Sequence, residues 1–252
     1  MSDQQPVLTE IADGVMLITL NRPASLNAMS RGLVDGLSAA LNQANSNDDV
    51  RAIVLTGAGR AFCAGVDLKE LSEGGSVLDD DSRIKGAFAN CRKPLIAAVN
   101  GAAFTGGLEM VLNCDFLYAA NTARFGDTHA KVGLMPTWGM SQRLSRVIGI
   151  NRAREMSLSG SPIDAQTAFE WGLVNKICSG ESLVQEAMDK AREIAENHAD
   201  AVVGIRKLMN DGWETSLAGG LELEDTLSRP FNQAVDFSLM GDRLGQVKKS
   251  NR

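Results

Sequence analysis

Apolar residues gather in short continuous runs along the first two thirds of the chain, a pattern that predicts β-strands. Such runs lie at 7–11, 15–20, 51–56, 95–99, 115–119 and 173–178. The first two flank Asp13-Gly14, a dipeptide typical of a β-hairpin turn. We therefore expect a sheet that opens with a hairpin.

Elsewhere apolar residues recur at three- and four-residue spacing, which predicts helices with one apolar face. The clearest early case starts at Leu26 and passes through Met29, Leu33, Leu37 and Leu41. Further helices are expected at 107–112, 141–148, 161–171, 183–197, 201–210 and 213–237.

These elements together predict an α/β fold built from strand-strand-helix units. The α/β core is expected over 1–195 and a helical C-terminal region over 196–252. Within that region, Asp200 is expected to be the N-cap of the helix at 201–210.

Composition fits one large domain or a core with an appendage, because 44% of the 252 residues are hydrophobic. The net charge of −6 argues against a nucleic-acid partner. A phosphate-bearing small ligand remains open, since a few local Arg or Lys residues can bind it.

Cysteines and histidines form no pattern of metal ligands. The chain has four cysteines and two histidines, and no cysteine pair has Cys-x-x-Cys spacing. We therefore expect no metal site, and buried free thiols in a reducing compartment. Segment 1–6 is polar, and glycines, Asn100 and Glu109 interrupt the longest apolar stretch, 94–112. The sequence thus predicts a soluble, cytoplasmic protein with no membrane partner.

Two glycine-rich turns, 60–68 and 100–109, each follow an apolar run and lead into a predicted helix. The first backbone N–H groups of a helix have no helical partner and can bind a negative oxygen. Two such turns facing each other could hold one carbonyl oxygen as it becomes an oxyanion. The alternative is that these glycines serve only as tight turns.

A third glycine pattern, 55–62, follows a strand and resembles the start of a dinucleotide-binding fold. That fold requires a small residue where Phe62 stands. A nicotinamide-dependent oxidoreductase is therefore disfavoured, and no P-loop motif is present.

The motifs in order resemble the enoyl-CoA hydratase/isomerase (crotonase) family. The resemblance rests on the segments 61–68, 96–101, 106–109, 114–115 and 133–136, and it extends from about Val7 to about Val174. It implies a spiral core of strand-strand-helix units and a coenzyme A thioester as substrate, with no separate cofactor. It also implies a homotrimer or a dimer of trimers, with 196–252 serving oligomerisation and covering the active site.

The resemblance assigns the oxyanion hole to the amides of Val66 and Gly106. For the coenzyme A part of the substrate it points to the loop near residue 22 and to the first glycine turn. The residues so assigned are Arg22, Ala24, Leu26, Phe62, Ala64, Gly65, Val66, Asp67, Leu68 and Lys69. It further relates Phe237, Lys248 and Lys249 to positions that contact a neighbouring subunit's ligand. Apart from the resemblance, we expect 71–82 and 84–88 to shape the acyl pocket.

Glu109 matches one of the family's two catalytic glutamates, and its apolar neighbours suggest that burial raises its pKa. The alternative is an exposed helix carboxylate. The second glutamate is replaced, because His129 stands at its position in Phe125-Gly126-Asp127-Thr128-His129. Histidine can move protons near neutral pH, although a histidine without a role is the alternative. Asp127 is a substitute candidate.

These observations predict an acyl-CoA-transforming enzyme, most simply an enoyl-CoA hydratase, with Glu109 and His129 as its acid/base groups. Because His129 replaces a glutamate, an isomerase or racemase that shuttles one proton, or an acyl-CoA hydrolase, is the alternative reaction. A non-catalytic acyl-CoA binder is the alternative of another class.

Overall fold

The computed structural model describes residues 5–74 and 81–235. The chain divides into two compact units, 1–199 and 200–252. The first unit contains both β-sheets and the residues predicted for catalysis, the oxyanion hole and coenzyme A binding within one subunit. The described part of the second unit is helical. The division lies close to the predicted boundary after residue 195, and the roles expected of 196–252 stay predictions.

The larger sheet has six strands in the order β1-β2-β3-β5-β7-β10. These are β1 (Val7–Ala12), β2 (Val15–Leu20), β3 (Ala52–Gly57), β5 (Leu95–Val99), β7 (Phe116–Ala120) and β10 (Lys176–Cys178). β1 and β2 form the predicted antiparallel hairpin, in which Asp13 and Gly14 have φ of 52° and 76°, as a type I′ turn requires. The other neighbours pair in parallel.

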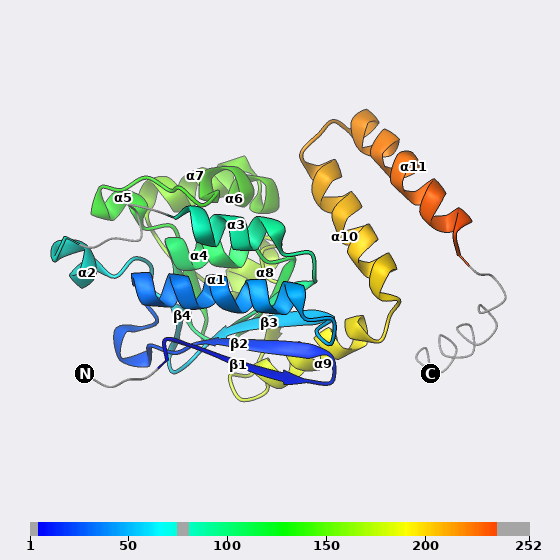
Figure 1. Cartoon of the computed structure of the whole chain (residues 1–252). Helices are drawn as coiled ribbons and strands as arrows, with labels where there is room; N and C mark the ends of the chain where they lie inside the picture. Colours follow the sequence, from blue (N-terminus) through cyan, green and yellow to red (C-terminus); the bar gives the residue numbers. More distant parts are fainter. Residues whose placement is uncertain (1–4, 75–80, 236–252) are drawn as a thin grey trace. The chain divides into compact units, whose positions relative to one another are not determined.

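A second sheet has four strands in the order β4-β6-β8-β9. They are β4 (Ala61–Cys63), β6 (Ala102–Phe104), β8 (Arg124–Gly126) and β9 (Ile163–Asp164). Each of β3, β5 and β7 in the larger sheet is followed along the chain by a strand of the smaller sheet, and then by a helix. This repeating order confirms the predicted α/β class and its strand-strand-helix core. Figure 1 shows the helices and the first four strands by their labels.

Helices occupy most of the remaining described chain. They are η1 (Pro23–Ser25), α1 (Arg31–Ser46), α2 (Leu68–Ser72), α3 (Ser82–Asn90), α4 (Gly106–Leu112), α5 (His129–Val132), α6 (Met140–Ile148), α7 (Ile150–Ser159), α8 (Ala165–Glu170), α9 (Leu183–Ala195), α10 (Ala199–Trp213) and α11 (Leu217–Gln233).

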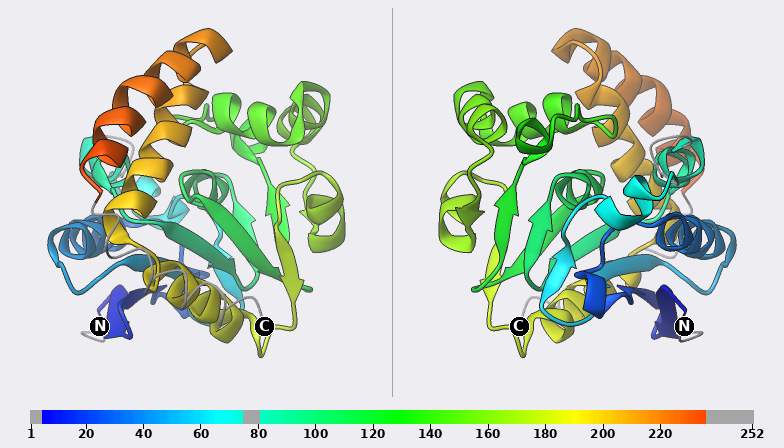
Figure 2. Two further views of the ribbon diagram at one scale, coloured as in Figure 1. Left: turned by 90° about the vertical axis from the view of Figure 1, so that its right-hand side faces the viewer. Right: turned by 90° about the vertical axis from the view of Figure 1, so that its left-hand side faces the viewer.

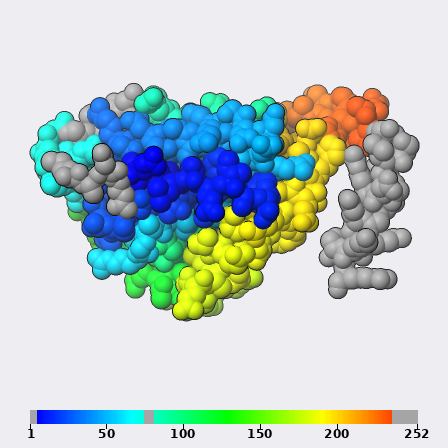
Figure 3. All heavy atoms as spheres, turned by 60° about the horizontal axis from the view of Figure 1, so that its bottom comes forward, coloured from blue at the N-terminus to red at the C-terminus, as the bar shows by residue number. Residues whose placement is uncertain are grey.

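The inner strands β3 and β5 of the larger sheet are buried on both faces. Successive side chains of a strand point to opposite sides, so each strand contributes to two cores. In β3, Ile53 and Leu55 join the main apolar core with α1 and α4, whereas Ala52 and Val54 join a second core with α9. Figure 2 shows α9 lying across one face of this sheet. Figure 3 shows the blue β1–β2 hairpin beside yellow α9 at the surface.

Two predicted helix starts are wrong. The helix expected from Leu26 begins at Arg31, because Leu26 and Asn27 take left-handed conformations (φ 53° and 54°) and Ser30 caps α1 by accepting from the Leu33 amide. The helix expected from Ser161 begins later, since β9 precedes α8. Apolar spacing does not register left-handed residues or two-residue strands.

Two C-terminal predictions also need correction. Asp200 lies inside the first turn of α10 and is therefore not its N-cap. The single helix expected over 213–237 is interrupted, since Trp213 ends α10 and Ser216 caps α11 by accepting from the Gly219 amide. Phe237, Lys248 and Lys249 lie outside the described residues, as does 75–80 of the predicted acyl-pocket loop.

The predicted absence of disulfides is confirmed for the described residues. Cys63, Cys91 and Cys178 are buried, Cys114 is half-buried, and none of the four forms a disulfide there. Burial raises the pKa of the Cys63 thiol to about 12. Among the described residues, no helix is long and apolar enough to span a membrane.

Candidate active site

The smaller sheet brings the candidate residues to one edge. Its strands β4, β6 and β8 are adjacent and parallel, so their carboxyl ends point the same way. The chain continues from β4 to Val66, from β6 to Gly106 and Glu109, and from β8 to His129. Residues far apart in the sequence therefore converge where three strands end.

The two predicted glycine turns are in contact. Gly65 has φ of +104°, and a Cβ there would lie 3.3 Å from the Thr105 Cβ. A Cβ at Gly107 would lie 2.2 Å from the Cys63 carbonyl oxygen, a distance that no side chain tolerates. Glycine at these two positions thus permits the close approach of the turns.

The amides assigned to the oxyanion hole have no acceptor within the described structure. Met29 pairs with the first turn by donating to the Gly65 carbonyl and accepting from the Asp67 amide, at 2.8 and 3.1 Å. This pairing uses the Gly65 carbonyl and the Asp67 amide, and it gives the Val66 amide between them no acceptor. Gly106 is the first residue of α4, where an N–H has no helical partner.

Glu109 is buried, with 3% of its surface exposed. Its Oε1 accepts from the backbone amides of Trp138 (2.7 Å) and Met140 (3.2 Å). Burial raises the pKa of Glu109, and the two amides and His129 offset only part of that effect. The predicted burial of this carboxyl is confirmed, and the alternative of an exposed helix carboxylate is excluded.

His129 lies between two carboxyl groups. Its Nδ1 is 2.6 Å from the Asp127 Oδ1, and its Nε2 is 3.8 Å from the Glu109 Oε2. Burial alone would raise the pKa of Asp127, but hydrogen bonds from His129 and Ser157 outweigh burial and lower it. An ionised Asp127 requires a proton on Nδ1, so the neutral imidazole presents the Nε2 lone pair toward Glu109.

Thr105, immediately before Gly106, has a strained backbone. Its φ and ψ of 55° and −117° belong to a turn corner that favours glycine. A β-branched residue there costs about 1–3 kcal/mol. The Thr105 hydroxyl lies 2.6 Å from the Thr128 hydroxyl, and its amide donates to the Gly126 carbonyl at 2.9 Å.

The residues assigned to the coenzyme A moiety lie on two neighbouring segments, since the Ala64 amide donates to the Leu26 carbonyl at 3.1 Å. Ala24, Leu68 and Lys69 are exposed. Arg22, Leu26, Ala64, Val66 and Asp67 are half-buried, whereas Gly65 is buried.

Two of these residues have structural contacts of their own. The Arg22 guanidinium lies 2.9 Å from the Asp67 carboxylate and donates to the Ala28 carbonyl at 2.6 Å. The Phe62 side chain is fully buried in the main core, so only its backbone is available to a ligand. Their assignment to coenzyme A stays a prediction.

Sequence reasoning missed the supports behind Glu109 and beside Arg22. Trp138 holds Glu109 through its amide, while its indole Nε1 donates to Asp81 at 2.8 Å. Asn27 is fully buried and donates to the Ala58 and Ala61 carbonyls. A signal for Asn27 was present, because a cluster of Asn, Pro and Ser residues such as the one at 21–27 is typical of a loop.

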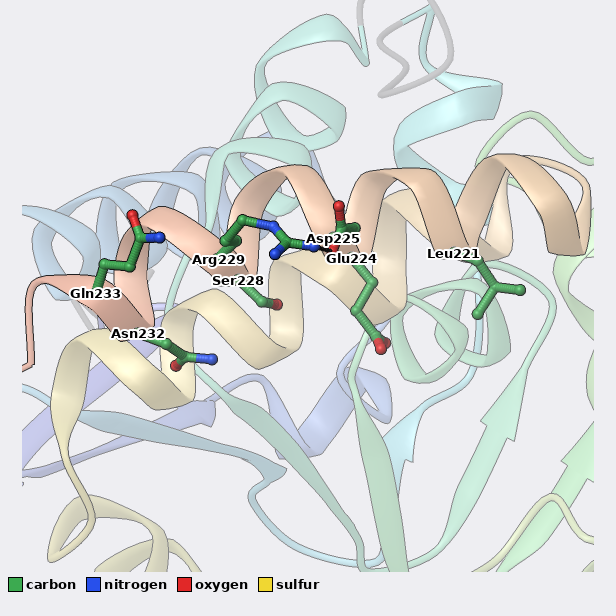
Figure 4. A pocket seen from close by; sticks show the side chains of 7 residues that line it. All are labelled: Leu221, Glu224, Asp225, Ser228, Arg229, Asn232 and Gln233. Atoms are coloured by element: carbon green, nitrogen blue, oxygen red, sulfur yellow. Dashed lines mark hydrogen bonds and ion pairs between the residues drawn. The ribbon is translucent and has the colours of Figure 1, made fainter.

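One surface hollow of the molecule belongs to α11. Figure 4 shows that its lining comes from a single face of α11, from Leu221 to Gln233. That face contains none of the predicted site residues. A groove against one helix has no second wall, so it does not enclose a reacting substrate.

Comparison with known proteins agrees with this geometry. The sequence model of the enoyl-CoA hydratase/isomerase family matches residues 10–242. The chain belongs to this family. A probable peroxisomal enoyl-CoA hydratase 1 of Arabidopsis thaliana is 42% identical over 217 residues, covering 84% of this chain and 80% of the relative. A probable enoyl-CoA hydratase of Rhizobium meliloti is 39% identical, covering 88% of each.

Solved structures agree on the fold. The crystal structure of an enoyl-CoA hydratase from Bacillus anthracis has a TM-score of 0.89 and 35% identity, covering 97% of each chain. The resemblance to the crotonase family is therefore confirmed, and the protein is an enzyme of the hydratase/isomerase type.

Proposed function

We propose that the enzyme adds water to the double bond of an enoyl-CoA thioester, making it a lyase of the enoyl-CoA hydratase kind. The observation that carries this proposal is the buried constellation Asp127–His129–Glu109 beside the glycine turns, with the His129 Nε2 3.8 Å from the Glu109 Oε2. Both named relatives are hydratases by description.

The proposed oxyanion hole consists of the amides of Val66 and Gly106. Adding water next to a thioester builds an enolate, whose negative charge collects on the thioester oxygen. One preorganised donor at such an oxygen is worth roughly 2.7–4 kcal/mol. The unused amides and the contact between the two turns support this assignment.

In the proposed reaction, His129 is the base and Glu109 the acid. A water oxygen bonds to the β carbon while its proton passes to the His129 Nε2. The Glu109 carboxyl then gives its proton to the α carbon of the enolate. The proton sits on Oε2, because Oε1 already accepts two amides, and the raised pKa favours this form. Transfer from His129 to Glu109 restores the starting state.

The spacing of the two groups supports hydration. One water molecule can hydrogen-bond to two groups 3.8 Å apart, because each contact spans about 2.8 Å. Hydrolysis of the thioester is the second candidate, and the Asp127–His129 pair favours it, since a carboxylate-oriented imidazole can also direct water at a carbonyl carbon. A single-carboxylate proton shuttle uses Glu109 alone.

The deciding experiment incubates the protein with unsaturated and saturated CoA esters in heavy water, followed by mass spectrometry. Hydration gives a product with deuterium and the mass of added water. Deuterium without added water indicates isomerisation or racemisation, and free coenzyme A indicates hydrolysis. Binding with no product in any assay indicates a non-catalytic acyl-CoA binder.

Matched variants test the two groups. Glu109→Gln and His129→Ala are each expected to lower kcat by about 100-fold or more, the contribution typical of a general acid or base. His198→Ala is the control, because His198 is the exposed second histidine outside the site. Full turnover in Glu109→Gln would remove Glu109 from the mechanism.

The proposed assembly is a homotrimer or a dimer of trimers. Within 199–233, no residue of α10 or α11 is buried, and large apolar side chains such as Met209, Trp213 and Leu217 are 63–82% exposed. Exposed apolar surface on this scale supports contact with further copies. Coenzyme A enters only as part of the substrate, and the cytoplasmic location stays a prediction.

A further inference from the structure

We infer that the hydroxyl pair Thr105–Thr128 is a positioning contact that fixes His129 against Glu109. The inference rests on the proposed function, because it assigns these two threonines to the same acid/base site. Neither threonine is placed in contact with the substrate.

The contact joins the two halves of the site. Thr105 stands one residue before Gly106 and four before Glu109, whereas Thr128 stands one residue before His129. Their hydroxyl oxygens are 2.6 Å apart. This one hydrogen bond therefore links the turn before Gly106 to the turn before His129.

Every polar group of Thr105 is used in this junction. Its amide donates to the Gly126 carbonyl at 2.9 Å, and its carbonyl accepts from the Glu109 amide at 3.0 Å. Its side chain binds Thr128, and only 6% of the residue is exposed. Thr105 therefore binds the segment before His129 on one side and the helix that presents Glu109 on the other.

The strain of Thr105 indicates that its hydroxyl has a purpose. Its φ and ψ suit glycine, which would occupy this corner without strain but would offer no hydroxyl. A strained backbone persists only where surrounding contacts hold it, and such residues gather at functional sites. The Thr128 hydroxyl is the side-chain partner that a glycine would lose.

The test compares Thr105→Gly and Thr128→Val with Thr128→Ser. The first two remove the contact, and each is expected to lower kcat by about tenfold, the worth of one buried hydrogen bond, with KM little changed. Thr128→Ser keeps the hydroxyl and is expected to retain most of the activity. The double variant is expected to lose no more than either single variant, because one contact is removed in each.

Thr56→Val is the matched control for loss of a buried threonine hydroxyl. Thr56 lies in β3, is 4% exposed and donates to the Ala98 carbonyl at 2.8 Å, outside the site. Thr105→Gly is expected to lower the Tm no more than Thr56→Val does, because relief of backbone strain offsets the lost hydrogen bond. Of these two variants, Thr105→Gly alone is expected to lower kcat. If Thr105→Gly, Thr128→Val and Thr56→Val each lowered kcat in proportion to their loss of Tm, the inference would be overturned.

A readout without substrate separates this inference from the proposed function. The chain has two histidines, so the ring signals of His129 are assigned in NMR spectra by comparison with His198→Asn. Those signals are expected to shift in Thr128→Val and to stay in Thr128→Ser. Unshifted signals with full activity in Thr128→Val refute the positioning role. An inactive wild type with the expected NMR shifts refutes the proposed reaction alone.

Discussion

At the scale of single residues, the site places two carboxyl groups in opposite electrostatic states on either side of one imidazole. Asp127 is held ionised by hydrogen bonds, whereas burial favours the protonated form of Glu109. The two groups differ because the hydrogen bonds at Asp127 outweigh its burial and those at Glu109 do not. This difference makes one carboxyl fit to orient His129 and the other fit to carry a proton.

The same difference predicts opposite dependences of stability on pH. Burial raises the folded pKa of Glu109 above 4.5, so the folded state binds this proton more tightly than the unfolded state does. The resulting stability is fully present below pH 4.5 and is lost as pH rises from 4.5 through the folded pKa. Glu109→Gln is therefore expected to be more stable than the wild type at pH 8, with the difference shrinking toward pH 4.5. Thermal melts across this range measure it. A difference that does not vary with pH contradicts the assignment.

Asp127 has the reverse sign. Its folded pKa is lowered below 3.8, so its ionised form contributes stability that is present above this value and lost as pH falls through the folded pKa. Asp127→Asn is expected to be less stable than the wild type at neutral pH, with the gap closing at strongly acidic pH. Asp35→Asn, an exposed carboxylate outside the site, is the control.

At the scale of elements, the sequence predicts strands well where apolar runs have clear ends. β5 matches its predicted bounds because Pro94 and Asn100 flank it. The three-residue strands β4 and β6 are missed, since so short a segment shows no periodicity. The candidate site residues follow the ends of these missed strands, so the sequence predicts the candidates but not how they converge.

The same distinction between local sequence patterns and contacts formed on folding applies to individual site residues. Apolar neighbours predict the burial of Glu109 along its own helix. The Thr105–Thr128 contact and the Trp138 amide on Glu109 depend on segments that meet only after folding. No periodicity or motif spacing encodes such contacts.

A helix boundary gives a stability prediction at this scale. Ser30 caps α1, with its Oγ accepting from the Leu33 amide at 3.3 Å. Ser30→Ala is expected to lower the free energy of unfolding by about 1 kcal/mol, measured by urea denaturation. Ser46→Ala, at the exposed end of the same helix, is expected to change it by less. Equal losses of unfolding free energy in both variants would contradict a specific contribution of the Ser30 cap.

At the scale of the whole molecule, apolar side chains on α10 and α11 are exposed in the single chain. If further copies cover them, a charge placed there must disrupt assembly, because burying an unpaired charge is costly. Met209→Glu is expected to shift the protein from a multiple of three chains to a smaller species, as sizing with light scattering would measure. Arg206→Glu, three residues away, tests whether any new acid on α10 has this effect.

The convergence of Val66, Gly106, Glu109 and His129 on the ends of three parallel strands has a consequence for how such an enzyme can change. The strands supply a frame, while the proposed reacting groups lie on the short segments that follow it. An exchange at residue 129 therefore replaces the chemistry of one position without disturbing the sheet below. Under the proposed function, new reactions would arise here through single substitutions in those segments, with thioester binding retained.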